Sequence, residues 1–280
     1  MYVNFICVIL IINKKIDMKK IIIVFLVFSN FLAFSQNDST KVIASTIPVV
    51  AQSKPIKKGV EVFLLSNIGG GVLISTQKIN SEAERDFVNS LRKGLVFDLG
   101  FYFKLNKNSA LGFKYNSFGS SGQITRSELS VNGLVSIDED EKLGLNFYCL
   151  SYLINLNNSK SPHDIFLELS AGYLTYNQEA AFAGSLNNQK VNLPNDLTYA
   201  YARGNTIGFL IGFAYKYRVS ENFSFGPNVN YSNGTITEVE LKEPGSALKT
   251  VKLTEEKYVG LARFDFSVGA TYKFWLKSVF

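Results

Sequence analysis

Hydrophobic and polar residues alternate along most of the chain after residue 59, with the two-residue period that is typical of β-strands. The clearest run, 95–105, has Leu or Phe at every odd position and small or polar residues between them. Similar runs lie at 111–116, 165–173, 207–218, 223–231 and 263–274, and less regular ones, apolar on both faces, at 60–65 and 145–154. The pattern predicts about eight strands.

The connections between these runs alternate between short and long. Short segments rich in Asn and Ser lie at 106–109, 157–162 and 220–222, and long ones at 75–92, 121–140, 178–204 and 237–256. Short periplasmic turns and long extracellular loops are typical of outer-membrane barrels. The sequence therefore predicts an all-β fold, a transmembrane antiparallel up-and-down β-barrel with both termini in the periplasm.

Glycine recurs on the polar face of the runs, which indicates where that face points. A solvent-facing side of a soluble barrel usually carries Lys, Glu and Thr, whereas glycine weakens a strand unless another group must approach closely. The narrow interior of an eight-stranded barrel is such a place. The glycines concerned are Gly100, Gly112, Gly172, Gly208, Gly212, Gly226 and Gly269. We therefore expect the polar face inside and the aromatic face in lipid; a secreted soluble β-barrel is the alternative.

The N-terminal region divides into three segments that precede the barrel. Residues 18–35 have a basic start, a short apolar core and a small-x-small exit, which predict a secretory signal peptide. We interpret residues 1–17 as an extension from a misassigned start codon and residues 36–58 as a flexible periplasmic leader. The predicted barrel occupies residues 59–280.

Charge and cysteine content narrow the class of protein. The chain has 29 basic and 23 acidic residues, but four of the lysines and one aspartate lie in residues 1–35, which leaves 25 and 22. This balance argues against a nucleic-acid partner. Cys149 is the one cysteine after residue 35, so no intramolecular disulfide is expected within the mature chain.

The last strand carries a pattern of polar, x, Gly, x, x, aromatic, x, aromatic. It is formed by Ser267, Gly269, Tyr272 and Phe274, and the chain ends on Phe280. This pattern resembles the assembly signal of outer-membrane barrels, and residues 59–280 resemble the small OmpA/OmpX-like and PorT-like barrels. The resemblance implies the outer membrane of a Gram-negative bacterium, contact with outer-membrane lipid and lipopolysaccharide, and insertion by the barrel-assembly machinery. In the known signal the motif closes the chain, whereas here six residues follow it.

Charged residues on the inward face are the candidate functional groups. A charge inside a narrow barrel must be paired or hydrated. We expect a network of ion pairs that fills the lumen; a pair such as Arg263 with Asp98 or Glu168 could instead gate a small pore. The predicted network consists of Glu61, Asp98, Lys104, Lys114, Glu168, Lys216, Arg218, Arg263, Asp265 and Lys273.

The sequence does not predict an enzyme, a cofactor or a metal site. The one histidine, His163, falls at a predicted periplasmic turn, the opposite end from the catalytic sites of barrel enzymes. We expect a structural or interaction role for a filled barrel, through loops such as 178–204 and 237–256 or through docking of a periplasmic or secretion partner. The alternative is a minor porin-like channel for small solutes.

Overall fold

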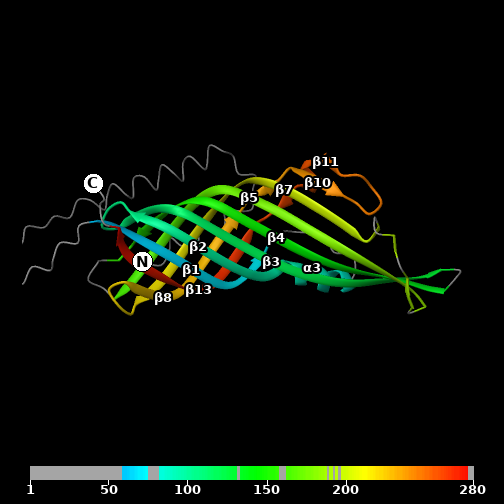
Figure 1. Ribbon diagram of the computed structural model, residues 1–280, viewed down its shortest axis with the longest axis horizontal. Helices are drawn as coiled ribbons and strands as arrows, with labels where there is room; N and C mark the ends of the chain where they lie inside the picture. The colour runs from blue at the N-terminus through cyan, green and yellow to red at the C-terminus, as the bar shows by residue number, and fades with distance from the viewer. Residues whose placement is uncertain are drawn as a thin grey trace, which may run out of the picture. The chain divides into compact units, whose positions relative to one another are not determined.

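Eight long antiparallel strands close into a ring (Figure 1). The computed structural model describes residues 59–74, 82–130, 133–157, 162–187, 189–191, 193–194 and 197–276. The predictions for 1–17, 18–35 and 36–58, and for Phe280, fall outside these residues. The elements of the barrel unit, in chain order, are β1 (Val60–Leu73), α3 (Glu82–Arg92), β2 (Lys93–Lys104), β3 (Ser109–Ser130), β4 (Gly133–Asn155), β5 (His163–Leu186), β6 (Gln189–Val191), β7 (Tyr199–Arg218), β8 (Phe223–Asn233), β9 (Thr235–Ile236), β10 (Glu238–Lys242), β11 (Lys249–Lys252), the 3₁₀ turn η2 (Glu255–Lys257), β12 (Val259–Gly260) and β13 (Arg263–Leu276).

The ring closes between the first and last strands. Each of β1, β2, β3, β4, β5, β7, β8 and β13 pairs with its two neighbours, and β13 pairs with β1 from Val60↔Leu276 to Leu73↔Arg263. Consecutive long strands are neighbours throughout, so the topology is up-and-down. The predicted fold class, an all-β barrel of eight strands, is confirmed.

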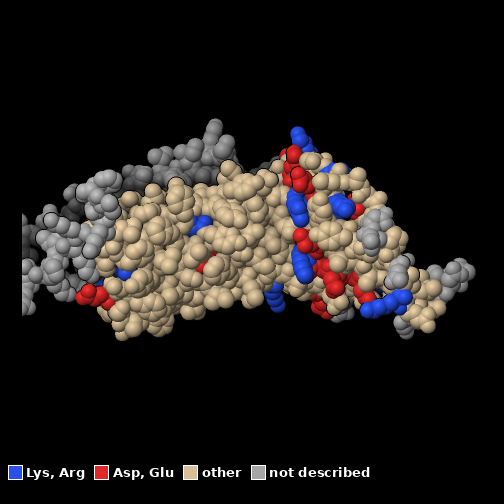
Figure 2. Space-filling model, viewed as in Figure 1, with Lys and Arg blue, Asp and Glu red and all other residues tan. Residues whose placement is uncertain are grey.

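The aromatic face of the strands points outward, as the alternation predicted. Leu95, Ile207 and Phe213 are 74%, 78% and 49% exposed, whereas Asp98 and Lys216, on the other face, are fully buried. Figure 2 shows a broad band over the middle of the barrel that is almost free of charge, followed by a belt of charges of both signs near α3, β10 and β11. Because a closed ring pairs every strand, such a band can face hydrocarbon without an unpaired edge.

The strands are unequal, and this corrects the predicted long loops. β3, β4, β5 and β7 have 20 to 24 residues, whereas β1, β2, β8 and β13 have 11 to 14. Most of 121–140 is a continuous hairpin that pairs from Ser109↔Ile154 to Ser130↔Gly133, and much of 178–204 is strand as well. The alternation of apolar and polar residues fades in these segments because neither face of the strands meets lipid. The sequence pattern therefore ends before the strands do. We call this paired region the strand extension.

The segment 75–92, also predicted as a loop, contains the helix α3. Phe87, Val88 and Leu91 form its buried face, which packs against Ile124 and Leu143. The helix lies on the inward side of the strand extension, since Ile124 shares its face with Phe118 inside the barrel. The 87, 88, 91 spacing is the helical signal in the sequence.

The contact between α3 and β3 is close. Ser120 Oγ donates to Leu91 O at 2.6 Å, and a Cβ at Gly122 would lie 2.5 Å from Ser90 Oγ. In the fourth predicted loop, 237–256, β10 pairs with both β7 and β11. Within the described residues no helix is long and apolar enough to cross a membrane.

Inward glycines allow neighbouring strands and side chains to meet. A Cβ at Gly269 would lie 2.1 Å from both Ser66 O and Asn67 Oδ1, whereas one at Gly119, on the outward face, would meet nothing within 4 Å. We therefore expect Gly269→Ala to destabilise the barrel by about 1–3 kcal/mol, the usual range for overpacking. Gly119→Ala is the matched control and should have little effect. Urea unfolding in detergent micelles, read by tyrosine and tryptophan fluorescence, measures both; equal midpoints would contradict the prediction.

Candidate functional site

The interior of the barrel is the candidate site, and it contains stacked layers of side chains. The barrel has a terminal end, where β1 begins and β13 ends, and an extended end, which carries α3 and the strand extension (Figure 1). Charged groups occupy the interior from the terminal end to beyond the middle of the strands, and an apolar cluster follows toward the extended end.

The central layer is built around Lys114. Its Nζ lies 2.8 Å from Glu168 Oε2 and 3.8 Å from Asp98 Oδ2, and the three side chains are almost completely buried. The other oxygen of Glu168 accepts hydrogen bonds from Tyr102 Oη at 3.0 Å and Ser151 Oγ at 2.7 Å. Charges held in this way satisfy the pairing that a buried ion requires.

Lys216 lies in the same layer and is held by neutral groups. Its Nζ donates to Asn67 Oδ1 at 2.9 Å, to Gly269 O at 3.0 Å and to Gly226 O at 3.1 Å. Asn67 Nδ2 in turn donates to Asp98 Oδ2 at 3.3 Å. Asn67 therefore connects the Lys216 ammonium to the central carboxylates.

Arg263 forms the next layer, with a partner that differs from the predicted gate. Its Nε and Nη2 lie 2.6 and 2.9 Å from the two oxygens of Asp265, two residues along β13. Arg263 also donates to Asn116 Oδ1, and Asn116 Nδ2 donates to Asp98. Arg263 therefore meets neither Asp98 nor Glu168 as an ion pair, because its own strand supplies a carboxylate on the same face.

A third charged layer lies at the terminal end. Glu61 Oε2 is 2.6 Å from Lys104 Nζ, and Asp164 binds both Arg218 Nη2 at 2.6 Å and Lys273 Nζ at 3.1 Å. Sequence reasoning missed Asp164 because it adjoins a predicted turn. Its inward position could have been read from its spacing of four residues before Glu168.

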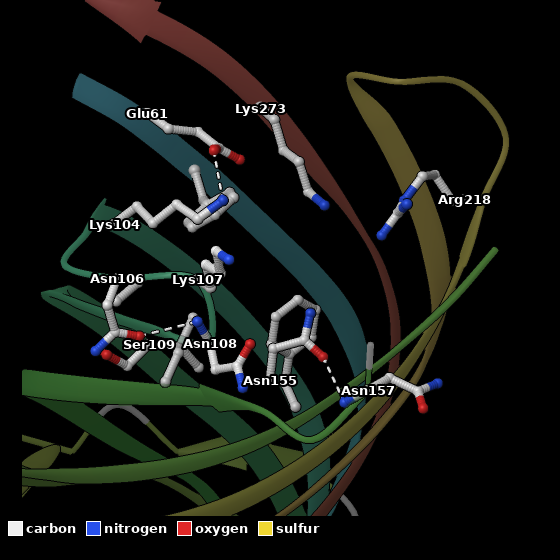
Figure 3. Close-up of a pocket in the computed structure, with 14 residues that line it drawn as sticks. Glu61, Lys104, Asn106, Lys107, Asn108, Ser109, Asn155, Asn157, Arg218 and Lys273 are labelled. Carbon is white, nitrogen blue, oxygen red and sulfur yellow. Dashed lines mark hydrogen bonds and ion pairs between the residues drawn. The ribbon is translucent and has the colours of Figure 1, made fainter. Parts of the chain in front are cut away.

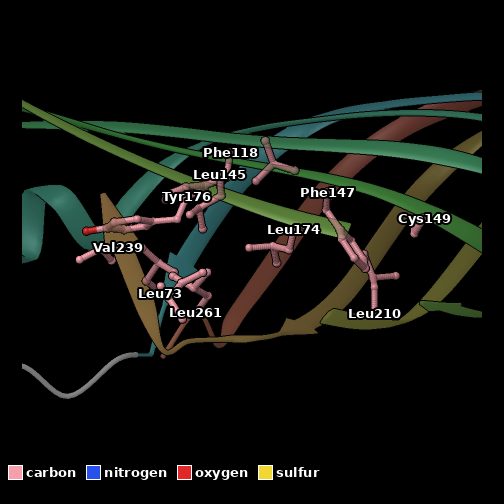
Figure 4. Close-up of a cluster of buried hydrophobic side chains, with 12 residues drawn as sticks. Leu73, Phe118, Leu145, Phe147, Cys149, Leu174, Tyr176, Leu210, Val239 and Leu261 are labelled. Atoms are coloured by element: carbon pink, nitrogen blue, oxygen red, sulfur yellow. The ribbon is translucent and has the colours of Figure 1, made fainter. Parts of the chain in front are cut away.

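An apolar cluster fills the barrel beyond the charged layers (Figure 4). It comprises Leu73, Val96, Phe118, Leu145, Phe147, Cys149, Leu174, Tyr176, Leu210, Ile236, Val239 and Leu261. The Arg263 guanidinium lies 4.9 Å from the centroid of the Phe118 ring, so cation–π contact joins the charged layer to this cluster. Leu145 and Phe147 account for the irregular alternation in β4, because the inward face of that strand meets this cluster and is apolar too.

His163 and Cys149 lie in different surroundings. His163 Nδ1 lies 2.6 Å from Tyr215 Oη, and the two rings stack on the outer surface. Cys149 is buried in the apolar cluster. Within the described ranges no group of three or more His, Cys, Asp and Glu residues is placed to hold a metal ion.

Glu141 is buried on the inward face of the strand extension, beyond the outer band that is almost free of charge. It accepts from Gln178 Nε2, and Gln178 Oε1 accepts from Tyr176 Oη. Burial, followed by the charge of Glu139, raises the pKa of Glu141 to about 7, and Arg126 partly opposes this rise. The inner side of the strand extension therefore contains a carboxyl group that titrates near neutral pH.

The closed ring of eight antiparallel strands, with an apolar exterior and a charged, filled interior, defines the fold of a small integral outer-membrane β-barrel. No family model matches the sequence, and no curated protein matches it. Among solved structures the chain is similar to the attachment invasion locus protein Ail of Yersinia pestis, with 14% identity over 78% of this chain and 99% of that chain and a TM-score of 0.37. It is also similar to OprG of Pseudomonas aeruginosa, with 12% identity over 78% of this chain and 98% of that chain and a TM-score of 0.42. A major outer membrane protein of Thermus thermophilus is similar as well, with 10% identity over 77% of this chain and 99% of that chain and a TM-score of 0.46.

Removing Lys114 tests the central layer. Lys114→Met leaves Glu168 and Asp98 without their cation in a dry interior, so we expect a loss of about 3–5 kcal/mol in the free energy of unfolding. Lys104→Met is the matched control, because its pair with Glu61 is partly exposed and should contribute roughly 0–1 kcal/mol. Unfolding by guanidinium in micelles compares the two. A Lys114→Met loss no larger than that of the control would show that the central charges are hydrated.

The strand extension should loosen as pH rises. An unfolded Glu141 ionises near 4.5, but the folded one keeps its proton until about 7. Stability is therefore full below 4.5 and falls as pH rises from 4.5 through 7. Hydrogen exchange of the strand extension, corrected for intrinsic rates, should show less protection at pH 8 than at pH 5, and Glu141→Gln should remove the difference. Glu240→Gln, exposed on β10, should retain it; a pH-independent wild type would refute the prediction.

Proposed function

We propose that the protein is a filled outer-membrane barrel with a structural or interaction role, which holds its strand extension at the cell surface. The observation that carries this proposal is the packed interior. Three layers of charged side chains and a twelve-residue apolar cluster occupy successive levels of the barrel.

Energetics favour a filled interior over a gated one. Opening a path would separate pairs such as Lys114 and Glu168, and a buried charge left without its partner is strongly destabilising. It would also require Phe118, Phe147 and Leu210, each at most 2% exposed, to leave a dry cluster. Moving these side chains out of the cluster would cost far more free energy than the rotation of one side chain that gates an open constriction.

We place the terminal end of the barrel in the periplasm. Its connections are short, with Val219 and Ser220 both donating backbone hydrogen bonds to Phe223 O across one of them. Short periplasmic turns and long outer segments are the rule for this class. In this orientation both ends of the barrel domain lie in the periplasm, and β13 presents Gly269, Tyr272 and Phe274 of the assembly signal to the barrel-assembly machinery.

The charged belt is the part of the outer surface where we expect lipopolysaccharide to bind. A groove of about 760 Å³ on this level is lined by Lys93 and Lys142 and by one carboxylate, Glu179, with Gly119 and Gly144 at neighbouring positions on paired strands. Lipid phosphates next to the apolar band would meet these lysines. We therefore propose that lipopolysaccharide and other outer-membrane lipids contact the barrel here, while the part of the strand extension beyond this groove remains available to a protein partner.

Planar-bilayer recordings test the filled barrel directly. Wild-type protein should give no stable conductance steps, because the apolar cluster interrupts any hydrated path through the described part of the interior. A general porin, reconstituted in parallel, shows that the assay detects channels. Stable steps whose size changes in Arg263→Gln would overturn the proposal and support a minor channel for small solutes.

If the recordings show no conductance steps, a labelling experiment must show that the protein is inserted in the membrane and in which orientation. Cysteine introduced at Lys252, on β11, should react with a membrane-impermeant maleimide in intact cells. Cysteine at Glu221, in the β7–β8 turn, should react only after the outer membrane is permeabilised. The native Cys149 is buried and contributes little background. The reverse pattern would invert the proposed orientation.

A further inference from the structure

A small cavity opens at the terminal end of the barrel (Figure 3). Its volume is about 70 Å³, and it is lined by side chains from β1, β7 and β13, by the ends of β4 and β5, and by the turn between β2 and β3. We propose that this cavity binds a small oxyanion, a phosphate or a carboxylate group presented from the periplasm.

Cations outnumber carboxylates around the cavity. Lys104, Lys107, Arg218 and Lys273 line it, whereas Glu61 is the one carboxylate among the described lining residues and Asp164 lies just behind them. Glu61 pairs with Lys104, and Asp164 is shared between Arg218 and Lys273. Two carboxylates thus face four cations in the described part of this mouth, which leaves a local positive charge for an anion to neutralise.

Ser109 supplies an independent reason to expect a ligand. Ser109 is 8% exposed and lines the cavity, and its Oγ is buried without a hydrogen-bond partner among the described residues. A buried hydroxyl without a partner costs free energy, so native structures rarely leave one. A small shift of the turn around Ser109 would open this hydroxyl to the cavity, and an oxyanion there would accept its hydrogen bond in addition to those from the lysine side chains.

The floor of the cavity is apolar, which distinguishes a binding site from the mouth of a channel. Phe63, Ala110 and Leu153 line it and belong to a buried cluster that also contains Leu65 and Tyr102. Since one water needs roughly 10–15 Å³ of such space, the cavity has room for an oxyanion but not for a metabolite of ordinary size. A larger molecule could insert only a terminal carboxylate or phosphate.

Four asparagines line the cavity, and the amide groups of two of them are already engaged as donors. Asn155 Nδ2 donates to Asp164 Oδ1 at 3.1 Å, and Asn157 Nδ2 donates to His163 O at 2.9 Å. Lys107 is the best residue to change, because it lies in a turn and no ion pair within the described ranges ties it to the fold. Removal of the Lys107 charge should weaken binding of the anion without disturbing the fold of the barrel.

Thermal unfolding and calorimetric titration of the full chain in a neutral detergent test the site with inorganic phosphate as the probe. At constant ionic strength, phosphate should bind saturably and raise the Tm, whereas chloride should not. Lys107→Gln should weaken phosphate binding about tenfold, the equivalent of one lost charge-assisted contact. Lys252→Gln, which removes an exposed lysine at the extended end, is the matched control and should bind like wild type.

Ser109→Ala separates binding from folding. It should unfold at the wild-type Tm or above in the absence of phosphate, because it removes an unsatisfied hydroxyl, yet it should bind phosphate more weakly. Acetate distinguishes the source: saturable acetate binding indicates a carboxylate ligand, and phosphate binding alone indicates a phosphate.

Three results would overturn the site. These are equal effects of phosphate and chloride, equal losses in Lys107→Gln and Lys252→Gln, and unchanged phosphate binding in Ser109→Ala. Measurement in micelles requires neither conductance nor membrane orientation, so a failure here would leave the proposed function standing.

Discussion

Pairing between the first and last strands is the constraint on which the rest of this molecule depends. In hydrocarbon every backbone N–H and C=O must find a partner within the protein, so a sheet can cross only as a closed ring. The fourteen paired positions between β1 and β13 complete that ring. Closure with eight strands also makes the interior narrow, and the narrow interior determines which side chains the inward positions can carry.

Within that interior, charge and packing are coupled. Lys114, Glu168 and Asp98 are stable there because Asn67, Tyr102 and Ser151 complete their hydrogen bonds. Glycines such as Gly269 allow the strands to approach closely enough for those bonds to form. The apolar cluster beyond Arg263 then excludes water from one side of the charged layers, which strengthens the ion pairs and closes the interior.

The two ends of the barrel differ because different constraints act on them. At the extended end the strands continue beyond the apolar band, and α3 covers their inner face through Phe87, Val88 and Leu91. At the terminal end the chain turns sharply, and the cavity with Ser109 remains as a small polar recess over an apolar floor. The strand extension and this recess are thus separated by a filled barrel.

The sequence by itself determined the class of fold, the number of strands, the short turns and the direction in which each regular strand faces. Period-two alternation is a local property, and lipid on one side with a narrow interior on the other makes it unambiguous in runs such as 95–105. It also predicted ten inward charges by position, because in a regular strand the parity of a residue decides its face.

Only the tertiary structure decided the partners. The pair of Lys114 with Glu168 joins residues far apart in the chain, so the order and register of the strands decided it. Arg263 pairs with Asp265 on its own strand, and only the arrangement of the side chains in the interior decided between this carboxylate and that of Asp98. The strand extension was also beyond the pattern, since outside lipid both faces of a strand can be polar and the alternation that predicts a strand disappears. The helix α3 left only the short 87, 88, 91 spacing as its signal in the sequence. Asp164 was missed for a similar reason, because the regular alternation begins at residue 165, whereas β5 already begins at His163.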